Sequence, residues 1–311
     1  MNIRILSIIV SLTIISLIYW QIDFAKIIQV IIQVNILWLL LALFLVVPTI
    51  SLTALRLKFL SLQSNKIEFK DAIKLILAAS VMNIVLPSKM GDLAKGIFIV
   101  KDKNIGYAQA MPLVIFEKIN DILALLFWCI FGLIFLQKFG SLYISILLLS
   151  IVFFMIGVLA ISSRIFANTI FDLFVFLLPS KFSTNTNEFR NGWLEVCKNT
   201  KKENSKILFL TILSIFIWFL HLVQIWLFII CLGYEVAFLF SIAITPLAIF
   251  AGLLPLTFSG VGTRDLAFIY LYSAYLTAPA AAALGLLTTL RYIIPAIIGI
   301  PFFSYYLKKV R

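Results

Sequence analysis

A polar segment rich in helix-breaking residues, Leu254 to Asp265 (LPLTFSGVGTRD), interrupts two apolar runs near the end of the chain. Its proline and two glycines do not continue a regular helix, and its arginine and aspartate are costly in hydrocarbon. The flanks, Val236 to Leu253 and Leu266 to Leu276, are nevertheless apolar enough for a bilayer. A broken backbone at membrane depth is tolerated only where it is buried in protein or lines a wet cavity. We therefore interpret this segment as one half of a substrate site.

An earlier segment, Asn83 to Asp92, has the same pattern. Both segments place Leu-Pro after an apolar run, then a glycine, and then an aspartate that opens a second apolar run. Downstream, Glu117 lies 25 residues after Asp92 and Arg291 lies 26 residues after Asp265, each within a long apolar stretch. A duplicated unit is the simplest explanation of this correspondence.

The composition indicates a membrane protein. The chain has 311 residues, of which 63% are hydrophobic, and its mean hydropathy is +1.14. We expect a single polytopic membrane domain over residues 1–311. The formal net charge of +12 is then best explained by cytoplasmic loops and anionic lipid headgroups, rather than by nucleic acid. The longest polar segment, residues 162–206, is expected to be a cytoplasmic loop.

The apolar pattern predicts an all-α membrane protein with about six transmembrane helices and two re-entrant helical hairpins. The basic cluster that begins with Arg56 and Lys58 places the end of the second helix in the cytoplasm, and both termini are expected there. The hairpins then enter from opposite sides, which makes residues 35–137 and 207–307 an inverted repeat, a recurrent transporter design. The expected spans are residues 5–19, 35–54, 112–136, 141–161, 207–232 and 279–306, and the hairpins are residues 71–100 and 236–276.

Metal, cofactor and catalytic motifs are not evident in the sequence. Cys129, Cys197 and Cys231 match no metal-binding or disulfide spacing, and His221 is the only histidine. The glycine-rich segment matches no nucleotide-binding pattern. We expect no cofactor, no metal and no catalytic residue, and we interpret His221 as a packing residue.

The candidate site consists of polar residues at the two breaks and in the helices that follow them. Arg291 at a helix centre could bind a lipid phosphate, or form a permanent salt bridge with Glu117 or Asp121. These two acids, four residues apart, share a helix face and could bind a cationic headgroup, carry a proton or clamp helices together. The predicted substrate-binding residues are Asn83, Ser88, Asp92, Glu117, Asp121, Gly260, Gly262, Arg264, Asp265 and Arg291.

Structural alternatives remain open for the residues at the breaks. Asn83 and Ser88 could contact substrate or only satisfy free backbone groups at the hairpin tip. Arg264 and Asp265 could simply cap the outgoing helix, whereas the glycines before them could expose amides to an anion.

These motifs resemble the flippase-like membrane domain of the lysylphosphatidylglycerol synthase family. The resemblance rests on N-x-x-L-P-x-x-x-G-D from Asn83 to Asp92, on Glu117-x-x-x-Asp121, on Leu254 to Asp265, and on Arg291. It covers nearly the whole chain. It implies a protein of the bacterial or archaeal plasma membrane that translocates an anionic or aminoacylated phospholipid, or a polyprenyl-linked lipid.

The resemblance also implies which partners and activities to expect. In the full-length synthases a separate soluble domain performs the aminoacyl transfer; this chain ends at Arg311 without one, so we expect a transporter rather than an enzyme. Membrane phospholipids are the expected partners, and a separate soluble aminoacyl- or glycosyltransferase is a further candidate. The alternatives are an integral membrane transferase that modifies lipid headgroups, with Asp92, Glu117 or Asp121 as its base, and a scaffold that transports nothing.

Overall fold

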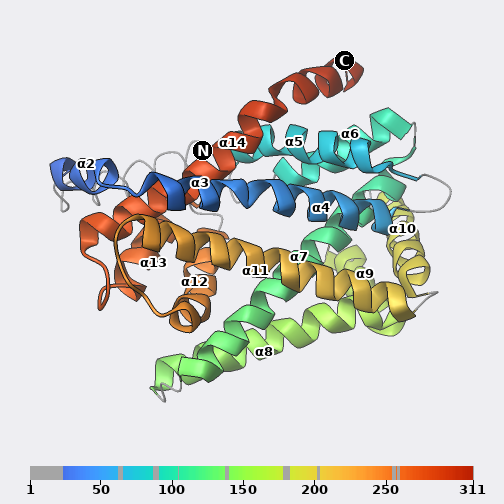
Figure 1. Cartoon of the computed structure of the whole chain (residues 1–311). Coiled ribbons are helices and arrows are strands. Elements are labelled where there is room, and N and C mark those ends of the chain that lie inside the picture. Colours follow the sequence, from blue (N-terminus) through green and yellow to red (C-terminus); the bar gives the residue numbers. More distant parts are fainter. Residues whose placement is uncertain are drawn as a thin grey trace.

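The computed structural model describes residues 24–61, 66–86, 91–103, 105–136, 140–177, 183–201, 204–253, 257 and 260–310. Within these ranges the regular structure is entirely α-helical (Figure 1), which confirms the predicted fold class. Pro87, Ser88, the Leu254-Pro255 pair and the predicted first span lie outside the described residues.

Within the described residues, five helical segments are long and apolar enough to cross a membrane. Each coincides with one of the spans predicted from the sequence, with ends that differ by a few residues. The span expected to end at residue 54 continues to Leu60, and Pro112, which was expected to start a helix, lies inside α7 (Tyr107–Leu136). The five candidates are Ile36–Leu60, Tyr107–Leu136, Ser141–Ser162, Ser205–Cys231 and Ala278–Lys309.

The N-terminal described helices lie along the outside of the bundle. The short helix α2 (Phe24–Ile32) buries Ile27 and packs against α14 (Ala278–Val310). The first described span is formed by α3 (Ile36–Phe44) and α4 (Val46–Leu60) in succession. Asn35 caps α3, because its side-chain oxygen accepts hydrogen bonds from two backbone amides of the first turn. Both α3 and α4 pack against α11 (Asn204–Cys231).

Two pairs of short helices occupy the positions of the predicted hairpins. The first pair is α5 (Phe69–Val85) and α6 (Gly91–Lys103), and the second is α12 (Phe238–Leu253) and α13 (Thr263–Leu271). The helices of each pair pack against each other. Figure 1 shows the first pair toward one end of the bundle and the second toward the other end. Their opposite entry into a membrane stays a prediction.

One helix of each predicted hairpin packs against a long helix of the other predicted half. The first hairpin's α5 packs against α14 of the second half, and α12 of the second hairpin packs against α7 of the first. Both contacts are close at a glycine. A Cβ added at Gly299 would come within 2.0 Å of the Leu77 carbonyl oxygen, and one added at Gly132 within 2.0 Å of the Ala243 carbonyl oxygen. These two contacts hold α5, α7, α12 and α14 around the same central part of the bundle.

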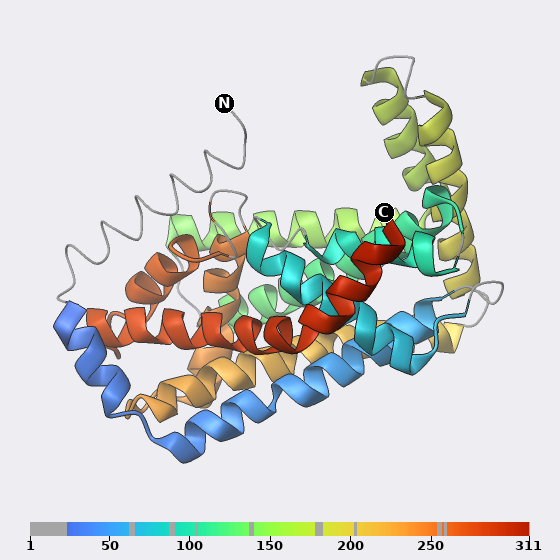
Figure 2. The same ribbon diagram turned by 90° about the horizontal axis from the view of Figure 1, so that it is seen from above.

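The predicted cytoplasmic loop, residues 162–206, is largely helical. After α8 (Ser141–Ser162) the chain forms α9 (Arg164–Leu177) and α10 (Ser183–Lys201). Figure 2 shows this pair extending away from the other helices. The base of α10 nevertheless packs on α7, where Trp193 lies beside Phe116 with ring centroids 5.8 Å apart. Because residues 162–206 were expected to be a loop, the sequence interpretation missed α10.

A labelling experiment tests the predicted orientation. Glu235→Cys should react with an impermeant maleimide from outside intact cells, and Lys198→Cys only after the cells are opened; both native side chains are exposed. The three native cysteines are buried. Burial raises the pKa of the Cys197 thiol to about 11, so near pH 7 this thiol is almost wholly protonated and unreactive. The opposite labelling pattern would show that the protein has the reverse of the predicted orientation.

Candidate functional site

A cavity of about 150 Å³ lies where seven of the described helices meet. Its walls come from α4, α5, α6 and α7 of the first predicted half and from α11, α12 and α14 of the second. Six charged side chains line it, three of each sign: Arg56, Lys95, Lys118, Asp92, Glu117 and Asp121. Such a concentration of charge within an apolar bundle requires close pairing, because each unpaired ion would be costly.

Arg56 on α4 is the centre of the first ion-pair group. Its Nη2 atom donates to Glu117 Oε1 at 3.0 Å, and its Nη1 atom donates to Asp121 Oδ1 at 2.6 Å and to Ser214 Oγ at 3.0 Å. Lys95 Nζ approaches the other oxygen of Glu117 at 2.7 Å. Arg56 and Glu117 are each only 1% exposed. The group therefore joins α4, α6, α7 and α11 through buried charges.

Asp92 at the first turn of α6 forms the second group. Its carboxylate accepts from Lys118 Nζ at 2.7 Å and from Asn83 Nδ2 at 2.9 Å. Its backbone N–H donates to Asn83 Oδ1 at 3.1 Å. The asparagine and the aspartate thereby fix the end of α5 to the start of α6. A carboxylate is also favoured at a helix N-terminus by the helix dipole.

The second break forms a separate polar group beside the cavity. Gly260 and Gly262 have positive φ values of 76° and 99°, which explains why glycine is needed at these positions. The Gly262 N–H donates to Asp265 Oδ2 at 3.0 Å, so Asp265 caps α13, as the structural alternative expected. Arg264 pairs with Asp265 at 2.7 Å and also donates to the Gly285 carbonyl and the Thr289 hydroxyl, both at 2.8 Å.

Arg291 on α14 is buried, 3% exposed, but has a different environment. Its Nη1 atom lies 3.4 Å from the His221 carbonyl and from Gln224 Oε1, and its Nη2 atom donates to the Tyr292 hydroxyl. No carboxylate of the described residues lies within salt-bridge distance. The predicted alternative of a salt bridge with Glu117 or Asp121 is therefore wrong, because Arg56 holds both acids.

Several buried donors near the cavity have no acceptor among the described residues. They are the Nε–H groups of Arg56 and Arg291 and the indole N–H of Trp218. Arg56 and Trp218 line the cavity, and Arg291 contacts two other residues of its wall, His221 and Tyr292. Buried donors are almost always paired. This part of the site therefore has more donors than acceptors.

The structure brings together some of the predicted site residues and separates others. Asn83, Asp92, Glu117 and Asp121 line the cavity itself. Arg291 lies just behind the wall, where it contacts His221 and Tyr292. Arg264 instead contacts Asp265, Gly285 and Thr289. The remaining residues of the second break, Gly260, Gly262 and Asp265, cap α13 and do not line the cavity. Ser88 lies outside the described residues.

Three functional candidates, Arg56, Lys95 and Lys118, were missing from the sequence prediction. Arg56 was assigned to a cytoplasmic basic cluster, yet it is buried within α4. Two acids four residues apart in a membrane helix require a cation from another helix, and Arg56 directly follows an apolar run. That requirement was the signal that could have identified it.

The fold and this site together define a polytopic integral membrane protein with an internal, charge-lined cavity. The family described as "Lysylphosphatidylglycerol synthase TM region" matches residues 4–299, and the chain belongs to this family. The chain is also similar to a UPF0104 membrane protein of Methanocaldococcus jannaschii, with 27% identity over 310 residues that cover 94% of this chain and 91% of that protein. The family confirms the resemblance seen in the sequence.

Proposed function

We propose that this protein is a lipid translocase that moves a phosphate-bearing lipid between the two leaflets of a membrane. The headgroup would pass through the cavity of Arg56, Glu117 and Asp92 while the hydrocarbon chains stay in the bilayer. Membership in the family supports a role at membrane lipids. The choice of a phosphate-bearing headgroup is based on the charges and donors of the cavity.

The observation that carries the proposal is Arg291, a buried arginine for which the described residues supply no carboxylate. Isolated buried charge is expensive and is retained in membrane helices mainly at functional sites. A guanidinium matches the oxygens of a phosphate in a bidentate geometry. An anionic headgroup would supply the acceptors that Arg291, Arg56 and Trp218 lack.

The net charge of the site favours an anion. The six charged side chains that line the cavity sum to zero, three positive and three negative, and Arg291 beside them makes the total +1. In the absence of lipid, the carboxylates of Glu117, Asp121 and Asp92 hold the lysines and Arg56 in place. A phosphate that enters would compete with these carboxylates for the same cations, so that binding exchanges ion pairs rather than exposing bare charges.

The other two predicted functions are less well supported by the contacts. A transferase would need a free base, whereas Asp92, Glu117 and Asp121 are each held by a lysine or an arginine. A scaffold without transport would be expected to pair all its buried charges, which Arg291 does not do within the described residues. The proposed inverted repeat of residues 35–137 and 207–307 offers a route to alternating access, because the cavity lies between its halves.

Reconstitution of the full chain in liposomes tests the proposal. Labelled phosphatidylglycerol in one leaflet should become accessible in the other at least about tenfold faster with protein than without it. Thr53→Phe, which places a ring at the cavity wall, should slow this exchange, whereas Leu52→Phe on the neighbouring residue should not; Thr53 lines the cavity and Leu52 does not. Equal rates in protein-free and wild-type liposomes would refute the proposal, and lipid modification from a soluble donor would favour a transferase.

A further inference from the structure

We propose that a second lipid site lies where α8, α9 and α10 meet α7 and α11, and that it holds an anionic phospholipid before its headgroup enters the charged cavity. The headgroup would occupy a basic cavity between α8, α9 and α10. One hydrocarbon chain would occupy an apolar cavity between α7, α8 and α11. This inference deepens the proposed function and rests on it.

The basic cavity has a volume of about 720 Å³ and an excess of positive charge. Arg164, Lys198 and Lys201 line it, against the single acid Glu195 among its lining residues, which gives a net charge of +2. Within the described residues, the side chains of Arg164 and Lys198 have no ion-pair partner. Basic residues at a membrane surface attract anionic headgroups, at about 1 kcal/mol each.

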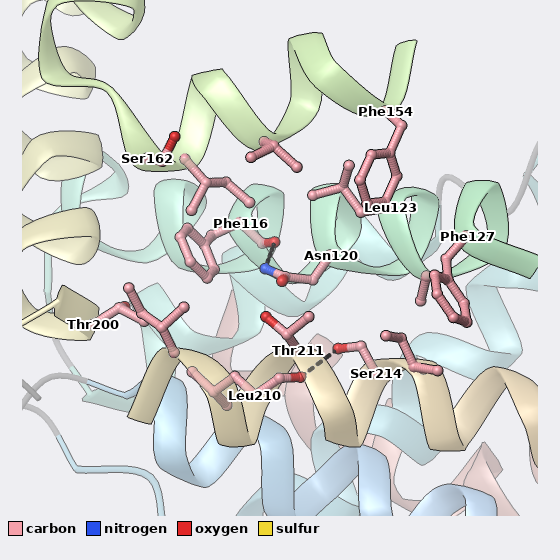
Figure 3. Close-up of a pocket in the computed structure, with 15 residues that line it drawn as sticks. Phe116, Asn120, Leu123, Phe127, Phe154, Ser162, Thr200, Leu210, Thr211 and Ser214 are labelled. Carbon is pink, nitrogen blue, oxygen red and sulfur yellow. Dashed lines mark hydrogen bonds between the residues drawn. The ribbon is translucent and has the colours of Figure 1, made fainter. Parts of the chain in front are cut away.

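The apolar cavity has a volume of about 150 Å³ and is lined mainly by aliphatic and aromatic side chains. Figure 3 shows Phe116, Leu123 and Phe127 of α7 facing Phe154 of α8 across it. Three of its polar side chains donate to backbone carbonyls of their own helices: Asn120 to Phe116 at 2.9 Å, Thr200 to Val196 at 2.7 Å and Ser214 to Leu210 at 2.9 Å. A surface of this kind suits a hydrocarbon chain rather than a headgroup.

The two cavities are adjacent, so that a charged headgroup in the basic cavity and its hydrocarbon chain in the apolar cavity could belong to one phospholipid. They share Ile161 as a wall residue, and chain neighbours divide between them: Ser162 and Thr200 line the apolar cavity, and Ser163 and Lys201 line the basic one. The Lys201 ammonium group donates to the Ser162 carbonyl, which fixes the end of α10 beside the end of α8. A headgroup near Lys201 would therefore have its chain directed toward α7 and α11.

The apolar cavity also borders the charged site. Ser214 lines the apolar cavity and accepts a hydrogen bond from Arg56 Nη1 at 3.0 Å, while Arg56 lines the charged cavity. In α7, Phe116 and Asn120 face the apolar cavity, and their chain neighbours Glu117 and Asp121 face the charged one. A lipid at the second site would lie next to the route that its headgroup must follow.

Lipid binding to the purified full-length protein tests this site separately from transport. The protein in detergent is titrated with phosphatidylglycerol, and bound lipid is counted by native mass spectrometry. Arg164→Gln combined with Lys198→Gln should weaken binding about 30-fold, since two contacts of about 1 kcal/mol each correspond to that factor. The control Lys66→Gln with Lys70→Gln removes the same charge from exposed residues outside both cavities and should change binding less than threefold.

The chain-binding half of the site needs a second pair of variants. Thr211→Phe fills the apolar cavity and should weaken binding, whereas Ile212→Phe, on an exposed neighbour that does not line it, should not. Equal losses in the test and control variants, or no loss in either test variant, would overturn the inference. If these losses occur but liposomes show no lipid exchange, the binding site stands and the proposed translocation fails.

Discussion

Arg56→Met is expected to destabilise the protein by about 3–5 kcal/mol, the cost of breaking a buried ion pair by removing one partner. The guanidinium holds Glu117 at 3.0 Å and Asp121 at 2.6 Å. Without it Glu117, 1% exposed, keeps only Lys95, and Asp121 loses the one ion-pair partner that the described residues give it. Thermal unfolding in detergent, followed by intrinsic tryptophan fluorescence, should show a midpoint many degrees below that of the wild type.

Two further variants separate this effect from a simple loss of volume. Adding Glu117→Gln and Asp121→Asn to Arg56→Met removes the uncompensated charges and should recover part of the lost stability. Lys58→Met changes an exposed residue of the same helix and should alter the free energy of unfolding by no more than about 0.5 kcal/mol. If Arg56→Met behaved like Lys58→Met, the buried ion-pair group would have little importance for stability.

The sequence predicts the spans well because their signal is local. Continuous apolar runs mark the five described spans, and the pattern of Leu-Pro, glycine and aspartate marks both helix pairs. The cap at the second break is equally local: Asp265 lies three residues after Gly262, the spacing of a capping interaction. Each of these predictions depends only on neighbours in the chain.

The partners within the cavity could not be predicted in the same way. Whether Arg56 or Arg291 pairs with Glu117 depends on which helices adjoin α7 and on their rotation, and neither is encoded in a local pattern. Arg56 also belongs to a run of basic residues that is typical of a cytoplasmic loop. The helix α10 was missed for a similar reason. It is polar, with two lysines in its last turn, and it is stabilised by packing on α7 and α9 rather than by an apolar run of its own.

Arg291→Gln is expected to reduce transport strongly, while its stability, unlike that of Arg56→Met, should stay the same or increase. A hydrogen bond to a charged group contributes about 1.5–3 kcal/mol, so the loss of the bidentate contact to phosphate should slow lipid exchange in liposomes roughly 10- to 100-fold. Stability should not suffer, because no carboxylate of the described residues depends on Arg291 and because its buried charge is itself costly. Both quantities are measured on the same purified preparation.

Two comparisons decide whether Arg291 acts as a ligand. Arg291→Lys keeps the charge but loses the planar fork, so its transport rate should lie between those of the wild type and Arg291→Gln. Arg264→Gln leaves Asp265 without the partner it has at 2.7 Å and should therefore lower stability, as Arg56→Met does. Full transport in Arg291→Gln would remove the main support for translocation of a phosphate-bearing lipid. A fall in stability as large as that of Arg264→Gln would instead make Arg291 a structural residue, acting through its contacts to His221, Gln224 and Tyr292.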